Sequence, residues 1–161
     1  MDRADHPCDD RPMVESDVST ALGGARERRE RLAAAADGLE QAITRAPGDL
    51  PAWQQGVQAA LDELRTTLVA HVDEVEAPDG LYTDISTRTP RLIHAIDRLR
   101  HDHLVLNDQV VELDGLVAAD DVLVEAVRER ALVLLTDISR HRHRGADLLW
   151  ESYDVDIGGW D

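Results

Sequence analysis

The chain has 161 residues and a net charge of −16, with 43% hydrophobic residues, only 3% aromatic residues and no Phe. One domain of this length can bury a core of Leu, Val, Ile and Ala, which favours packed helices over a β-sandwich or barrel. The acidic balance argues against nucleic acid or an anionic membrane as the main partner, and a single cysteine excludes a disulfide framework or a cysteine-rich zinc site.

Residues 1–17 are polar, contain proline and have no hydrophobic periodicity, which predicts a disordered N-terminal tail. Its His6, Cys8, Asp9 and Asp10 are metal-binding residue types, but a disordered tail rarely holds a fixed site. The chain shows no signal-like start and no apolar stretch near the roughly 20 residues of a membrane span. We therefore expect a cytoplasmic protein.

The first helix is predicted over residues 19–46, where Leu32, Ala36, Leu39 and Ile43 repeat at helical spacing. The pair Gly23-Gly24 weakens its start, and Ala46-Pro47-Gly48 ends it.

The second helix is predicted over residues 50–77, with Asp49 as its N-cap and Pro51 in its first turn. His71 falls on its apolar stripe. Pro78 disrupts the helix by removing a backbone hydrogen bond. The stretch Pro78 to Tyr82 predicts a turn or kink, with room for a short helix up to Ser86.

The third helix is predicted over residues 89–116, with Thr89 as cap and Pro90 in the first turn, and the fourth over residues 121–153. His103 lies in the middle of the third apolar stripe, and His141 lies on the fourth. Four long helices with short connections predict an all-α, up-down-up-down antiparallel four-helix bundle over residues 18–157, followed by a C-terminal tail at 158–161.

Three histidines, His71, His103 and His141, therefore lie at core positions of three helices. A buried histidine needs partners for both ring nitrogens, and a single one is usually a hydrogen-bonded core residue. Three inward histidines on facing helices are the way metal sites are built in bundles. At about 1.5 Å per residue, His71 and His103 match in height, whereas His141 matches only if the start of the fourth helix is not helical.

Carboxylates should accompany the histidines if iron or manganese is bound. Glu74 is the favoured partner of His71, unless a bulge near Pro78 rotates Glu76 inward. On the fourth helix, Asp147 lies one turn from His143, which makes His143 a rival to His141.

The segment Arg140-His141-Arg142-His143-Arg144 is strongly basic in an acidic chain. Pairing with neighbouring acids such as Asp137 and Asp147 is one interpretation, and contact with an anion or an acidic partner is the other. No catalytic nucleophile, phosphate-binding glycine loop or zinc-cysteine spacing is present in the sequence, so we expect no enzyme; ferroxidase or oxidase activity stays open.

The segments "HVDEVEAPDGLY", "RLRHDHLVL" and "HRHRGADLLWESY" follow one another in an order that resembles the hemerythrin-like, or HHE cation-binding, family. The resemblance covers roughly residues 50–155. It implies a four-helix bundle with a di-iron site that binds O2, senses oxygen, NO or iron, or stores iron. In that resemblance His71, His103 and His141 match histidine ligands, and Glu74 or Glu76 together with Asp147 match bridging carboxylates.

The chain also departs from the family pattern. Residues 19–46 contain no histidine, and the positions one turn either side of His103 are Leu99 and Asn107. At most five or six of the family's usual seven ligands remain. We therefore expect a non-haem iron protein with a mononuclear or incomplete di-iron site that binds or senses O2, NO or iron. The alternative is a metal-free bundle of the same ancestry that acts as an interaction or scaffold protein for a protein partner.

Overall fold

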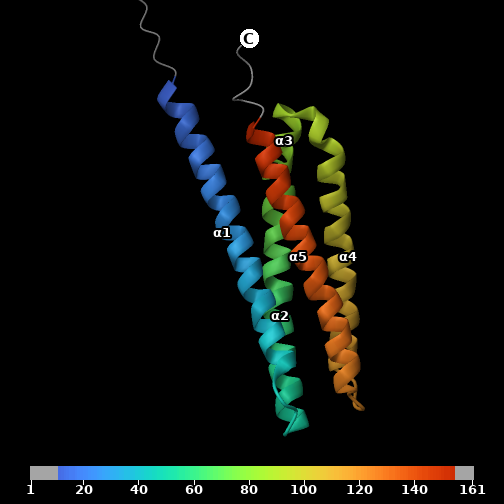
Figure 1. The fold of residues 1–161 in the computed structure, drawn as a ribbon. Helices are drawn as coiled ribbons and strands as arrows, with labels where there is room; N and C mark the ends of the chain where they lie inside the picture. Colours follow the sequence, from blue (N-terminus) through green and yellow to red (C-terminus); the bar gives the residue numbers. More distant parts are fainter. Residues whose placement is uncertain (1–10, 155–161) are drawn as a thin grey trace, which may run out of the picture.

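The computed structural model describes the backbone of residues 11–154 and the side chains of residues 23–153. Its long helices are α1 (Arg11–Thr44), α2 (Leu50–Glu76), α4 (Ile93–Val117) and α5 (Val124–Asp154). Between α2 and α4, the short helix α3 (Leu81–Arg88) and a 3-10 turn (Pro90–Leu92) cross one end of the bundle. Successive long helices run in opposite directions (Figure 1). Within the described residues there is no strand, and the predicted all-helical bundle is confirmed.

α1 starts earlier than predicted. Residues 11–17, expected in the tail, are helical, and the pair Gly23-Gly24 does not interrupt the helix. Extending an existing helix adds one hydrogen bond for each residue fixed, which offsets the roughly 1 kcal/mol that each glycine costs. Residues 1–10, with His6, Cys8, Asp9 and Asp10, and the predicted tail at 158–161 lie outside the described residues.

Both ends of α2 follow from its sequence. At its start, the Asp49 carboxylate accepts a hydrogen bond from the Ala52 amide at 3.0 Å, as expected of an N-cap. At its end, Ala77 takes an extended conformation (ψ 154°), which is the conformation favoured before a proline. Glu76 is therefore the last helical residue of α2.

Gly80 makes the corner between α2 and α3. Its amide donates to the carbonyl of Ala77 at 2.8 Å, and it lies against the end of α2. A Cβ at this position would come within 2.8 Å of the carbonyl oxygens of Glu74 and Val75, so only glycine fits. This close approach lays α3 across the end of the bundle, where it buries Tyr82 and Ile85.

The apolar stripes predicted on the four long helices are buried, and their side chains form two clusters. The loop-side cluster includes Leu32, Leu39, Leu61, Leu68, Leu106, Leu113, Leu134 and Ile138. The α3-side cluster includes Ala25, Val75, Tyr82, Ile85, Ile96, Leu99, Leu148 and Leu149. Along α2, α4 and α5 the three histidines fall between the two clusters, so they form one polar layer inside the bundle.

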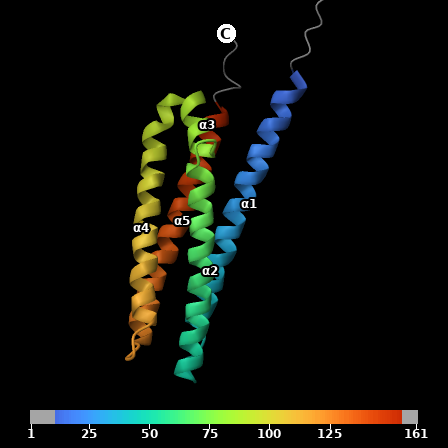
Figure 2. The same ribbon diagram turned by 180° about the vertical axis from the view of Figure 1, so that it is seen from behind.

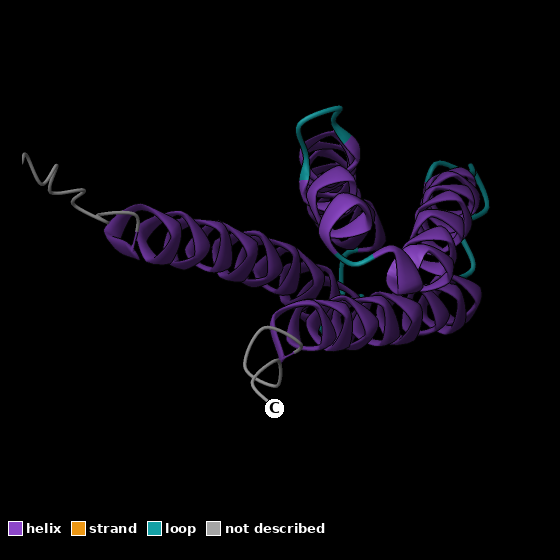
Figure 3. Cartoon of the chain, turned by 90° about the horizontal axis from the view of Figure 1, so that it is seen from above, coloured by secondary structure: helices purple, strands orange, loops and turns teal. Residues whose placement is uncertain are grey.

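α1 packs against its neighbours over only part of its length. Toward its N-terminal end it diverges from the other long helices, as the two opposite views show (Figures 1 and 2). Viewed from above, it projects well to one side of the remaining helices (Figure 3). Among the described residues, no helix combines the length and the apolar character that crossing a membrane requires.

Candidate metal centre

His71, His103 and His141 converge in the polar layer between the two clusters. The Nε2 atom of His141 lies 3.2 Å from Nε2 of His71 and 3.2 Å from Nε2 of His103. One ring nitrogen from each of the three lies within 4.8 Å of the others. His141 reaches the same height as the other two because α5 begins only at Val124, after the non-helical connection from Val117. The start of the predicted fourth helix is thus not helical, which is the condition for His141 to match His71 and His103 in height.

These separations suit a single ion. Imidazole nitrogens lie roughly 2.0–2.1 Å from a bound zinc ion, so two nitrogens at a near-tetrahedral angle are about 3.3 Å apart. The two Nε2 separations of 3.2 Å are close to that value. Neutral imidazoles suit iron and zinc alike.

A carboxylate lies next to the Nδ1 atom of two of the three histidines. Nδ1 of His103 lies 2.5 Å from Oε1 of Glu76, and Nδ1 of His141 lies 3.6 Å from Oδ2 of Asp102. Arg144 holds Asp102 through two hydrogen bonds of 2.8 and 2.9 Å. A histidine that binds a metal usually presents its other ring N–H to such a carboxylate, which fixes the tautomer and aims the free nitrogen at the ion.

The ring of Tyr82 completes the wall beside His103. The two rings stack with centroids 6.0 Å apart and planes 10° from parallel. Arg100 lies over Tyr82, with its guanidinium carbon 5.9 Å from the ring centroid. Burial, reinforced by the charge of Glu76, raises the pKa of Tyr82, so the phenol stays protonated.

Two ring nitrogens in the layer are not satisfied within the described side chains. Nδ1 of His71 and Nδ1 of His141 are buried and accept or donate no hydrogen bond. A buried polar group without a partner costs roughly 1–3 kcal/mol, so this layer is expensive for the protein on its own. A ligand that engaged the Nε2 atoms would offset part of that cost.

Burial keeps the three rings neutral. It lowers the pKa of His71 to about 3 and that of His141 to about 4, and in both the other histidines of the layer act in the same direction. Burial also lowers the pKa of His103, although the Glu76 carboxylate opposes the shift. Neutral imidazole is the form that binds a metal ion, so the site needs no deprotonation at neutral pH.

The structure brings together only some of the predicted site residues. Glu74 turns away from the histidines, with its carboxylate 3.1 Å from Arg31 and 3.8 Å from Arg28 of α1. Glu76, the less favoured choice, is the acid that reaches the layer, because α2 ends there and the corner at Gly80 folds back beneath it. The angles of a regular helix favour Glu74 over Glu76 as the partner of His71. In the structure, Glu74 instead lies on the α1 side of α2, where the two arginines bind it.

On α5, Asp147 is exposed and lies outside the histidine group. His143 is exposed as well, and its Nδ1 bonds to the carbonyl of Ser139 at 2.7 Å. α5 is a regular helix from Val124 to Asp154, so neither residue shares the inward direction of His141. Of the two rival histidines, the structure therefore places His141 in the layer.

Sequence reasoning missed Asp102 and Tyr82. Asp102 precedes His103 directly in the "RHDH" segment, and a helical neighbour of an inward ligand can reach the adjacent helix. Tyr82 follows the turn glycine Gly80 and carries no spacing that points to His103. Only the corner between α2 and α3 brings that ring to the site.

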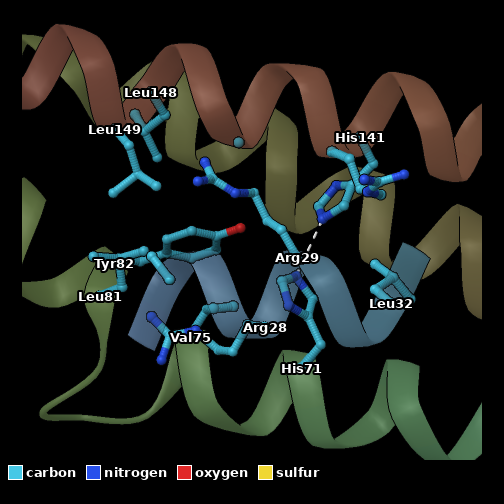
Figure 4. A pocket seen from close by; sticks show the side chains of 13 residues that line it. Arg28, Arg29, Leu32, His71, Val75, Leu81, Tyr82, His141, Leu148 and Leu149 are labelled. Carbon is cyan, nitrogen blue, oxygen red and sulfur yellow. Dashed lines mark hydrogen bonds between the residues drawn. The ribbon is translucent and has the colours of Figure 1, made fainter. Parts of the chain in front are cut away.

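A cavity of about 30 Å³ adjoins His71 and His141 on the side that faces α1 (Figure 4). This volume is enough for one or two water molecules or a diatomic molecule. Its walls are otherwise mainly apolar, with Leu32, Val75, Leu81, Tyr82, Leu148 and Leu149, and three arginines reach it, Arg28, Arg29 and Arg142. A small ligand beside the histidines would thus contact mainly apolar side chains.

Comparison with protein-family models, with curated protein sequences and with solved structures gave no match to this chain.

Proposed function

We propose that this chain is a hemerythrin-like metal protein that binds one iron ion through Nε2 of His71, His103 and His141 and uses it to bind or sense O2 or NO. The observation that supports the metal site is the convergence of the half-buried His71 with the buried His103 and His141, whose Nε2 atoms lie 3.2 Å from one another in the pairs His71–His141 and His103–His141. The choice of iron and of a diatomic ligand rests on the family resemblance.

The donor set fits one ion rather than two bridged ions. A di-iron centre of the family type would need bridging carboxylates, but Glu74 is bound to arginines of α1 and Asp147 is exposed. Glu76 is engaged by His103 Nδ1. The acids near the layer therefore orient histidines, which is the role of outer-shell partners.

The ion, the neighbouring acids and the cavity would each have a separate role in ligand binding. When bound, ferrous iron with three protein ligands would supply vacant positions for a small ligand. Glu76 holds the imidazole of His103 by a hydrogen bond, Asp102 lies 3.6 Å from Nδ1 of His141, and the rings stay neutral because they are buried. The cavity beside His71 and His141 gives the ligand room and limits competing water.

The test is metal analysis of the untagged full chain after anaerobic loading with ferrous iron, with zinc loading as a parallel sample. We expect about one iron per chain, and a change in the optical and electron paramagnetic resonance spectra when NO is added. The variant His141→Ala should lose the metal. His143→Ala is the matched control, two residues further along on the exposed side of α5, and it should retain the metal.

Three outcomes would count against the proposal. Two irons per chain would restore the di-iron interpretation and refute the mononuclear one. Retention of iron by His141→Ala would show that the ion sits elsewhere. Absence of bound metal after loading would leave the metal-free interaction bundle, in which the three histidines are structural.

A further inference from the structure

Arg29 of α1 and Arg142 of α5 line the same space between these two helices. Within residues 23–153, Arg29 and Arg142 form no ion pair, although the chain has a net charge of −16. The neighbours of Arg142 differ, because Arg140 pairs with Asp137 and Arg144 pairs with Asp102. Nε of Arg142 is buried and has no hydrogen-bond partner among the described side chains. A buried N–H of a charged group without an acceptor is costly, and an anion is its natural partner.

A hollow of about 280 Å³ lies between α1 and α5 at this place. Its lining residues are Arg26, Arg29, Glu30, Arg142, His143 and Ala146. The one carboxylate among them, Glu30, is bound by Arg26 at 2.8 Å. Among the described side chains, Arg29 and Arg142 therefore leave an uncompensated positive charge in the hollow, in a chain whose net charge is −16.

The same two arginines also line the apolar cavity beside the histidines, so the hollow and the cavity adjoin. In Figure 4 the side chain of Arg29 reaches into this pocket from α1, while Leu148 and Leu149 border it from α5. A ligand that filled both spaces would need an anionic end and an apolar end. Inorganic anions match only the first requirement.

We propose that this α1–α5 site binds a short monocarboxylate of the size of acetate, with its carboxylate at Arg29 and Arg142 and its methyl group in the apolar cavity of about 30 Å³. Guanidinium groups bind carboxylates through charge-assisted hydrogen bonds, and the acceptor would satisfy the buried Nε of Arg142. The methyl group would lie against Leu32, Leu148 and Leu149. The site is formed by the protein alone and does not depend on a bound metal.

The experiment is calorimetric titration of the full chain, freed of metal with EDTA, with formate, acetate, hexanoate and inorganic phosphate at constant ionic strength. We expect acetate to bind more tightly than formate, because its methyl group is buried, and hexanoate to bind more weakly than acetate, because its chain exceeds the cavity. Arg29→Gln and Arg142→Gln should each weaken acetate binding at least tenfold. Arg98→Gln, an exposed arginine of α4 without an ion pair among the described residues, should leave the affinity unchanged. Thermal unfolding of each variant checks that the fold is intact.

Gly145 offers a second test of where the methyl group lies. It lines the apolar cavity, and a Cβ there would meet nothing within 4 Å, so a larger side chain has space to enter. Gly145→Leu should remove the advantage of acetate over formate and leave the arginine contacts in place. Gly115→Leu, at an exposed and equally open position of α4, is the matched control.

No binding of any carboxylate would overturn the proposal. So would phosphate binding as tight as that of acetate, since that result identifies a site for inorganic anions only. Acetate binding that survives both arginine variants, an advantage of acetate over formate that survives Gly145→Leu, or hexanoate binding tighter than that of acetate would place the ligand elsewhere. Iron loading of Arg142→Gln, measured in parallel, separates this result from a failure of the metal site.

Discussion

Nδ1 of His103, in the middle of α4, lies 2.5 Å from Oε1 of Glu76, the last residue of α2. This contact joins two helices at the level of the histidine layer and fixes the ring so that its Nε2 points at His141. The His103 side chain is almost fully buried, at 3% exposure, whereas that of Glu76 is 31% exposed. The acid therefore lies at the margin of the core and orients the imidazole of His103 inside it.

Replacing Glu76 with Gln should weaken metal binding about 10- to 100-fold, because outer-shell carboxylates raise ligand basicity and fix the ring. The measurement is competition for the metal with a chelator of known affinity. Glu74→Gln is the matched control, and it should change the affinity less than twofold. A larger loss in Glu74→Gln than in Glu76→Gln would instead support a carboxylate ligand at position 74, as a family-type di-iron site would need.

His71→Leu should stabilise the metal-free protein at neutral pH by about 1–3 kcal/mol, because Nδ1 of His71 is buried without a partner and leucine has similar volume. The same change should abolish metal binding and the added stability that a bound metal gives. Urea unfolding with and without metal measures both effects. His94→Leu, at an exposed position of α4, should alter neither. Destabilisation of the metal-free protein by His71→Leu would contradict the assignment of a costly, unsatisfied imidazole.

The metal-free protein should lose stability as the pH falls below about 6.5. The folded state holds the pKa of His71 at about 3 and that of His141 at about 4, below their ordinary value of 6.5. The unfolded chain therefore binds protons that the folded chain excludes, and stability rises with pH in this window. Near pH 5 these two groups alone contribute a slope of roughly 2.7 kcal/mol per pH unit.

Urea unfolding at pH 7, 6 and 5 tests this dependence on the metal-free protein. His71→Leu should lower the slope near pH 5 by about 1.4 kcal/mol per pH unit, because one proton fewer is taken up on unfolding. The exposed His94→Leu should keep the wild-type slope. Equal slopes for the wild type and His71→Leu would show that His71 titrates normally in the folded protein.

Gly80→Ala should destabilise the protein by about 2 kcal/mol, because the added Cβ would press on the carbonyl oxygens of Glu74 and Val75. The displaced corner should also disturb the stacking of Tyr82 on His103, which near-ultraviolet circular dichroism can follow. Gly115→Ala, on an open and exposed stretch of α4, should instead stabilise the helix by roughly 0.5–1 kcal/mol. If both variants unfolded at the same urea concentration, the close packing at Gly80 would be of no energetic consequence.

Periodicity alone was enough to predict the helices and the three inward histidines. Leu68, His71 and Val75 on α2, for example, sit where a regular helix places its buried face, and all four apolar stripes are buried as expected. The cap at Asp49 and the break before Pro78 follow from local chemistry in the same way. These features depend on neighbouring residues in the chain, so the sequence contains the information for them.

The acids of the site could not be predicted in this way. Glu74 and Glu76 are two residues apart, so they point roughly 160° away from each other around a regular helix. The choice between them depends on where α2 ends and on the arginines that α1 presents to Glu74. Asp102 matters because of its reach to His141 on another helix, and Tyr82 because α3 lies across the bundle. Contacts of this kind are set by the packing of distant segments, which spacing along the chain does not encode.

α1 diverges from the bundle and contributes none of the three histidines, yet Ala25, Arg28, Arg29 and Leu32 form one side of the cavity. In the proposed site, the residues that would bind an ion and the residues that line its approach therefore belong to different parts of the chain. Substitutions in α1 can reshape the approach while the histidine geometry set by α2, α4 and α5 stays constant. Selectivity for small molecules could thus be engineered in this protein by substitutions in α1 alone.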